Sequence, residues 1–207
     1  MDFRVFAFWT GDNPLPENRL NCLKSMENIG IPIDLVFKHD VNGFVNKTGT
    51  PLHKNFEHLS LTHKADYLRV YFMHFFGGGY ADIKHYDKSW VNIFKKLNTS
   101  EDKYIAGYQE VSKNAVAQVG GRGQQELEKH FRLLAGNGAY ICKPQTEFTK
   151  EWFDRTNKVL DRKDFSGEYP LQWTELLGNV FHPLCLNYFQ HIILDDSIKP
   201  NFNKPYR

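Results

Sequence analysis

The chain has 207 residues, which fits a single domain, and its 41% hydrophobic and 24% charged residues allow a buried core and exclude wholesale disorder. The formal net charge of +2 is too small to indicate nucleic-acid binding by itself. Three distant cysteines without a CxxC pair argue against a zinc site and a disulfide framework. We expect a soluble, cytoplasmic protein, because no apolar run reaches the roughly 18 residues of a membrane span and the first run is too short for a signal peptide.

The first part of the chain predicts an α/β arrangement. Short apolar runs at residues 4–9 and 33–39 are rich in strand formers and indicate buried strands. The segment 17–30 between them predicts a helix, with apolar residues at helical spacing and a glycine suited to its C-cap: Leu20, Leu23, Met26 and Gly30. A strand, a helix and a second strand in this order indicate a mostly parallel central sheet flanked by helices.

A stronger helical pattern covers residues 60–76, after a polar, turn-rich segment at 40–58 that predicts a long loop. Apolar residues recur at steps of three and four and predict one buried stripe: Leu61, Ala65, Leu68, Phe72 and Phe75. Asp66 and Arg69 share another face of this helix, with Lys64 beside them. That polar face is either a solvated surface with an ion pair or part of a binding site.

The rest of the chain continues to alternate between strand and helix patterns. Strands are predicted at 80–83, 104–109 and 137–143, and helices at 90–98, 146–162 and 173–181. Residues 111–128 are polar and contain glycines, which predicts a mobile loop, and Arg122 within it could close over a ligand as a lid. The tail at 199–207 contains two prolines and is expected to be irregular.

Aromatic and charged side chains follow two predicted strands at the point where each strand ends. Trp9 is the last residue of the first apolar run, and Asp82 and Lys84 lie in the second half of the stretch "YADIK". Ligands of α/β folds bind at the carboxyl ends of strands, and a diphosphate needs positive charge, from a metal held by carboxylates or from Lys and Arg. Together with Asp66 and Arg69, these residues supply the types that a nucleotide-diphosphate site uses.

The segments "FAFWTGDNPLPENRLNCLKS" and "THKADYLRVYFMHFFGGGYADIK" resemble small glycosyltransferases of the GT-A fold. The resemblance is to the DXD sugar-binding group that includes capsular-polysaccharide enzymes, and large algal viruses encode similar small enzymes. The family pattern is an aromatic-Trp strand end, then Ser/Ala-Asp-x-x-Arg on a helix, then Gly-Gly-x-Tyr-x-Asp-x-Asp, and the chain matches it over residues 4–90. The resemblance implies one GT-A (Rossmann-like) domain over 1–207, with 1–100 as its nucleotide-sugar-binding half and 101–207 as its acceptor-side half.

The resemblance also implies roles for individual residues. The donor and its nucleotide would be bound by residues of both motifs: Phe8, Trp9, Thr10, Gly11, Lys64, Asp66, Arg69, Asp82 and Lys84. Asp82 would contact the ribose and a divalent cation, Mn²⁺ or Mg²⁺, with His182 as a candidate further ligand. Lys84 stands where the family has its second metal-binding aspartate. Either the lysine neutralises the diphosphate itself, or Asp82, phosphate oxygens and water hold the cation.

The implied reaction moves a sugar from a nucleotide donor, UDP-linked on family grounds, to a hydroxyl of a glycan or another acceptor. Asp82 and Glu175 are the candidate catalytic residues. Glu175, beside Trp173, would be the base that an inverting enzyme needs. The alternative is that Glu175 is a glutamate favoured at a helix N-terminus by the helix dipole. A retaining enzyme would need no such base. Asn137, Gly138 and Trp173 are candidate acceptor or donor-sugar contacts, although Asn-Gly also favours a tight turn.

Two other classes of function stay open. A degenerate member of the family would bind a nucleotide sugar without transferring it, and Lys84 in place of an aspartate favours that alternative. A nucleic-acid-binding module is suggested by "KHYDK", "GGRG" and the aromatic content of 15%, but the near-neutral charge argues against it.

Overall fold

A six-stranded sheet forms the centre of the computed structural model, which describes residues 1–167 and 171–206. The described strands lie in the order β2-β1-β3-β5-β4-β6 and are β1 (Val5–Trp9), β2 (Ile33–Phe37), β3 (Gly78–Ala81), β4 (Ile105–Gln109), β5 (Ala135–Cys142) and β6 (Ile192–Leu194). β5 runs antiparallel to both of its neighbours, and the other pairs are parallel. The predicted α/β fold with a mostly parallel sheet is confirmed.

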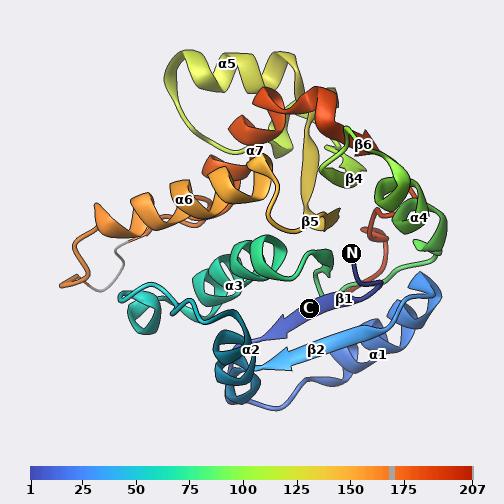
Figure 1. Cartoon of the computed structure of the whole chain (residues 1–207), viewed down its shortest axis with the longest axis horizontal. Helices are drawn as coiled ribbons and strands as arrows, with labels where there is room; N and C mark the ends of the chain where they lie inside the picture. Colours follow the sequence, from blue (N-terminus) through green and yellow to red (C-terminus); the bar gives the residue numbers. More distant parts are fainter. Residues whose placement is uncertain (168–170, 207) are drawn as a thin grey trace.

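Helices cover both faces of this sheet. The α-helices of the described residues are α1 (Glu17–Met26), α2 (Val41–Thr48), α3 (Leu61–Phe75), α4 (Val91–Thr99), α5 (Gly121–Lys129), α6 (Glu147–Asp161) and α7 (Gly178–Asn187). Figure 1 shows α1 and α4 on one side and α3 with α6 on the other. Because successive side chains of a strand point to opposite faces, β1 packs Phe6 and Phe8 into the cluster around α3 and packs Val5 and Ala7 against α1 and α4.

Helix α3 is buried around most of its circumference. Ser60 caps its start by accepting a backbone N–H of the first turn, and the chain leaves it through Gly77, whose φ of +64° favours glycine. α3 lies between the sheet and α6, so its polar side chains Asp66 and Arg69 are buried together with its apolar ones. The predicted stripe is wrong at its first residue, since Leu61 is 52% exposed.

Two segments predicted as loops contain helices. α2 lies within 40–58 and packs Phe44 against the core, and α5 begins within 111–128, ends at Lys129 and buries Leu127. Both helices are shorter than ten residues and consist mostly of polar residues and glycine, so the turn signals in these segments favour a loop over the few apolar residues at helical spacing. Three glycines indicate a loop in the sequence, but Gly120, with a φ of +75°, directly precedes α5, and Gly121 and Gly123 lie within the helix.

Other predicted boundaries shift by a few residues. β3 already includes two of the glycines predicted to end the helix, and β5 starts at Ala135, so Asn137 and Gly138 lie within a strand and not in a tight turn. The helix predicted from residue 173 begins only at Gly178. The described part of the tail from 199 has no helix or strand, as predicted. Of the helices within 1–167 and 171–206, none has the length and apolar character to cross a membrane.

Candidate functional site

A cleft lies at the edge of the sheet where the parallel strands end. Because β1, β3 and β4 run in the same direction, the residues that follow them, Thr10, Asp82 and Glu110, all reach this cleft. Its volume of about 590 Å³ is in the range of roughly 300–1,000 Å³ that small-molecule sites occupy. The predicted site residues that line it are Phe8, Trp9, Thr10, Gly11, Asp66, Arg69, Asp82, Lys84, Asn137, Gly138 and Trp173.

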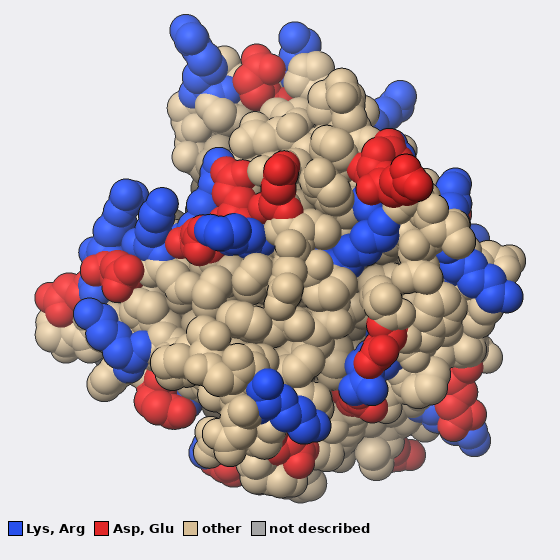
Figure 2. All heavy atoms as spheres, viewed as in Figure 1, with Lys and Arg blue, Asp and Glu red and all other residues tan. Residues whose placement is uncertain are grey.

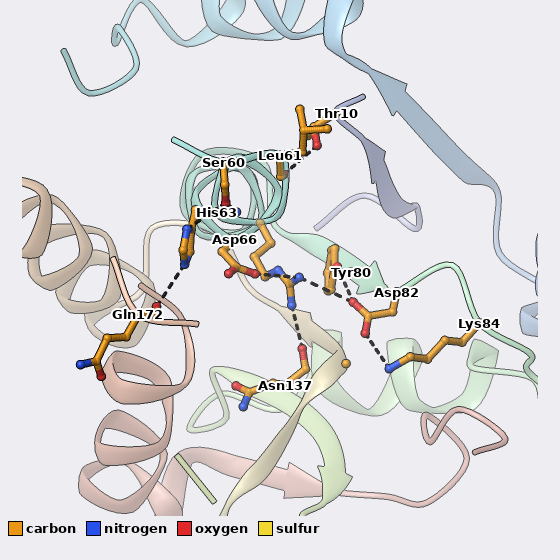
Figure 3. A network of polar contacts seen from close by, with 12 residues as sticks. Thr10, Ser60, Leu61, His63, Asp66, Tyr80, Asp82, Lys84, Asn137 and Gln172 are labelled. Atoms are coloured by element: carbon orange, nitrogen blue, oxygen red, sulfur yellow. Dashed lines mark hydrogen bonds and ion pairs between the residues drawn. The ribbon is translucent and has the colours of Figure 1, made fainter. Parts of the chain in front are cut away.

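Arg69 holds the centre of a buried polar network that joins α3, β3 and β5 (Figure 3). Its Nη2 lies 3.0 Å from Oδ1 of Asp66 and 3.6 Å from Oδ1 of Asp82. Its Nη1 donates to the backbone carbonyl of Asn137 at 3.0 Å, and its guanidinium carbon lies 4.2 Å from the ring centroid of Tyr80. With only 7% of Arg69 exposed, this arginine fixes the relative positions of the cleft residues more than it offers a free charge.

Asp82 is held as a carboxylate by its neighbours. Burial alone would raise its pKa, but Arg69, Lys84 and a hydrogen bond from Tyr80 outweigh that effect and bring the pKa below the ordinary value. Oδ2 lies 2.9 Å from Nζ of Lys84, and Oδ1 accepts the hydroxyl of Tyr80 at 2.6 Å. Asp66 behaves differently, because burial raises its pKa to about 6 in spite of Arg69 beside it. Asp66 and Asp82 therefore titrate in different pH ranges.

The residues around Asp82 do not fit a divalent cation of the DXD kind. Both oxygens of Asp82 already face hydrogen-bond donors or cations, and Lys84 brings a positive charge to the second position of the motif. Within the part of the chain that the structure describes, no group of three or more His, Cys, Asp or Glu side chains could hold a metal ion. His182 does not line the cleft, and its Nδ1 accepts the backbone N–H of Ala117 at 2.9 Å.

A second cavity of about 570 Å³ shares the loop after β1 with the cleft. Both are lined by Trp9, Thr10 and Gly11, which the resemblance assigns to the nucleotide. The loop is fixed in place, because the Trp9 indole donates to the carbonyl of Asn13 at 2.7 Å and the Thr10 hydroxyl donates to that of Leu61 at 2.7 Å. The two cavities therefore share this loop, and Trp9 is an aromatic residue in the wall of both.

Besides His182, two predicted residues are not brought to the cleft. Lys64 lines the second cavity, where its Nζ pairs with Glu57 at 2.6 Å. Glu175 lines neither cavity, and its carboxylate pairs with Lys163 at 2.5 Å and accepts the backbone N–H of Gln172 at 3.0 Å. Its position therefore does not support the predicted role as a base.

Sequence reasoning missed two parts of the cleft wall. Glu110, which follows β4 directly, is 5% exposed and lines the cleft. Glu110 directly follows the strand predicted at 104–109, so the rule that ligands bind at the ends of strands is the sequence signal that indicates it. The C-terminal tail also lines the cleft with Phe202 and Tyr206, whose ring centroids lie 5.3 Å and 5.0 Å from Nζ of Lys84.

Charged side chains outside the cleft are mixed in sign. Figure 2 shows Lys and Arg interspersed with Asp and Glu over the face in view, so this face has no continuous basic surface for a nucleic-acid backbone.

Comparisons with known proteins bear on the fold. No protein-family model matches the chain, and no curated protein matches its sequence, so the DXD, capsular and viral type of the resemblance stays a prediction. A solved structure named "PaToxG Glycosyltransferase" aligns with 90% of this chain and 68% of its own, with a TM-score of 0.55 and 13% sequence identity. The chain therefore shares its α/β fold with a glycosyltransferase of known structure.

Proposed function

We propose that this protein is a glycosyltransferase that moves a sugar from a nucleotide-sugar donor, UDP-linked by preference, to a hydroxyl of a glycan or another acceptor. The observation that carries the proposal is the network of Asp66, Arg69, Asp82 and Lys84 in one cleft at the strand ends of a glycosyltransferase-like fold. Fold similarity alone would not suffice, because one fold hosts many functions.

The donor would extend across both cavities. Trp9 borders each of them and offers an aromatic surface to a base, while the second cavity accepts the nucleoside. The diphosphate would then lie next to Lys84 and Arg19, two cationic side chains of the cleft. Arg19 comes from α1 and donates to the backbone carbonyl of Ile83, so both cations are tied to the segment after β3.

Lys84 would supply the charge for which the family uses a metal. A carboxylate that holds a dication brings a net single positive charge to the diphosphate, and a lysine ammonium brings the same charge. Asp82 orients the ammonium through the 2.9 Å contact, and the rings of Phe202 and Tyr206 lie beside it. In our proposal, transfer therefore proceeds without Mn²⁺ or Mg²⁺.

The reaction places negative charge on the leaving diphosphate. As the acceptor oxygen bonds to the anomeric carbon, the bond from that carbon to the diphosphate breaks and its electron pair leaves with the phosphate. The hydroxyl proton of the acceptor is released to solvent. A preorganised cation beside the leaving oxygen stabilises this charge, and one such contact contributes on the order of 10²–10³ to the rate in well-studied sites. Asn137, Gly138 and Trp173 line the same cleft, and we propose them as contacts of the sugar or the acceptor.

A binding protein without transferase activity is the second candidate. It is favoured by Asp82, because both oxygens of that carboxylate already have protein partners. A thermal-shift series with UDP, GDP and CMP, each with Mn²⁺ and with a chelator, separates the candidates when combined with a donor-hydrolysis screen, since a ligand of the folded state raises the melting temperature. A rise with UDP in chelator and release of UDP from a UDP-sugar support the transferase. A rise without release supports the binding protein, and no rise with any nucleotide refutes both.

A further inference from the structure

Glu110 is a buried carboxylate in the cleft wall that retains capacity to bind a ligand. Its Oε1 accepts the backbone N–H of Val111 at 2.7 Å, and its Oε2 lies 3.3 Å from Nε2 of His182. A carboxylate offers about four acceptor positions on its two oxygens. These contacts leave part of that capacity unused, although Glu110 is only 5% exposed and lines the cleft.

His182 contacts Glu110 from behind the cleft wall. The Nδ1 of His182 accepts the backbone N–H of Ala117 at 2.9 Å, and a backbone N–H always acts as a donor. Nδ1 is therefore engaged by the backbone, and Nε2 is the ring nitrogen that faces Glu110. The same Nε2 lies 3.2 Å from the side-chain amide of Asn137, a cleft residue. His182 is thus a positioning residue behind two groups of the cleft wall.

Glu110 has no lysine or arginine partner. Among residues 1–167 and 171–206, its salt-bridge contact is Nε2 of His182. Burying a carboxylate without a lysine or arginine partner is unfavourable, and groups held in this way in a cleft are candidates for a functional role. We propose that Glu110 binds the acceptor, whose attacking hydroxyl donates a hydrogen bond to the carboxylate. This inference rests on the proposed transferase function.

Glu110 lies apart from the donor residues in the sheet. Asp82 and Lys84 follow β3, whereas Glu110 follows β4, and β5 lies between these strands. Two apolar side chains that line the same cleft are exposed to solvent: Val111 is 48% exposed and Trp173 is 69% exposed. An alcohol with an apolar face next to its hydroxyl, as in a sugar ring, matches a carboxylate with such a rim.

Glu110→Gln tests the proposal, because it keeps the size of the side chain and removes its charge. The assay is release of UDP from the UDP-sugar that the wild-type protein cleaves fastest, with water as the acceptor, alongside the rise in melting temperature that UDP causes. We expect UDP release to fall about 10- to 100-fold, as for loss of a hydrogen bond to a charged group, with an unchanged UDP-induced rise. Glu128→Gln, on the exposed surface of α5, is the matched control and should change neither.

Each outcome decides the question. UDP release at the wild-type rate in Glu110→Gln overturns the acceptor role, and loss of the UDP-induced rise assigns Glu110 to the donor or to folding instead. If the wild-type protein neither binds nor cleaves a UDP-sugar, the proposed function fails with it.

Variants of His182 test the positioning role separately. His182→Gln keeps an N–H donor near the position of Nε2, whereas His182→Leu has none. We expect His182→Gln to release UDP faster than His182→Leu, with the same UDP-induced rise in melting temperature. Equal rates in the two variants would show that the Nε2 contact does not position Glu110.

Discussion

Replacing Asp66 with asparagine tests the electrostatics of the buried network through protein stability. Burial raises the pKa of Asp66 from 3.8 to about 6, a difference worth about 3 kcal/mol at 1.36 kcal/mol per pKa unit. Because the folded-state pKa lies above the unfolded one, this contribution to stability is complete below pH 3.8 and is lost as the pH rises through 6. Asp66 is only 4% exposed, so solvent screening is weak.

The asparagine side chain in this variant cannot titrate and resembles the protonated acid, so the variant lacks this pH dependence. From the two pKa values, about 2 kcal/mol of the effect falls between pH 4.5 and 7.5. We therefore expect the unfolding free energy of the wild type, measured against Asp66→Asn by urea denaturation, to drop by about 2 kcal/mol over that interval. Other titrating groups are common to both proteins and cancel in the comparison. A difference that stays constant with pH would refute the reasoning.

Three further predictions concern the cleft. Lys84→Ala should weaken UDP binding about 10- to 100-fold, as expected for loss of a charge-assisted contact, and an unchanged dissociation constant by calorimetry would exclude the diphosphate role. Lys84→Asp recreates the second carboxylate of the motif, so Mn²⁺ should raise UDP affinity in this variant and not in the wild type. If the wild type also needs Mn²⁺ to bind UDP, Lys84 does not replace the metal. In Gly136→Ala the new Cβ would lie 2.1 Å from the Tyr108 ring, so the free energy of unfolding should fall by about 1–3 kcal/mol. An unchanged midpoint of urea denaturation would show that the packing around Gly136 is looser than described.

The sequence was sufficient to predict that residues of α3 and of the end of β3 meet in the cleft. Asp66 and Arg69 are three residues apart on one helix, and Asp82 ends the strand that follows, so spacing and strand-end logic bring all three together. The same helix also shows a limit. Lys64 is only two residues from Asp66, which turns its side chain to another face of the helix and into the second cavity.

The cleft wall around Glu110 depends on sheet order, which local patterns do not determine. Glu110 follows β4, and it reaches the cleft because β5 inserts antiparallel between β3 and β4. Asn137 and Gly138 form a turn signal in the sequence, yet they lie in β5. A Cβ on Gly138 would lie 3.3 Å from both Asp82 Oδ2 and the Tyr108 hydroxyl, so close packing across strands is a sufficient reason for a glycine there.

The central claim is most directly tested by the release of UDP from UDP-sugars in the presence of chelator, compared between the wild type and Asp82→Ala. We predict turnover by the wild type and a loss of on the order of 10²-fold or more in Asp82→Ala, with folding intact by circular dichroism. Asp154→Ala, which removes a carboxylate of α6 outside the cleft, should retain wild-type turnover. Normal turnover by Asp82→Ala, or no turnover by the wild type with any UDP-sugar, would contradict the proposed site.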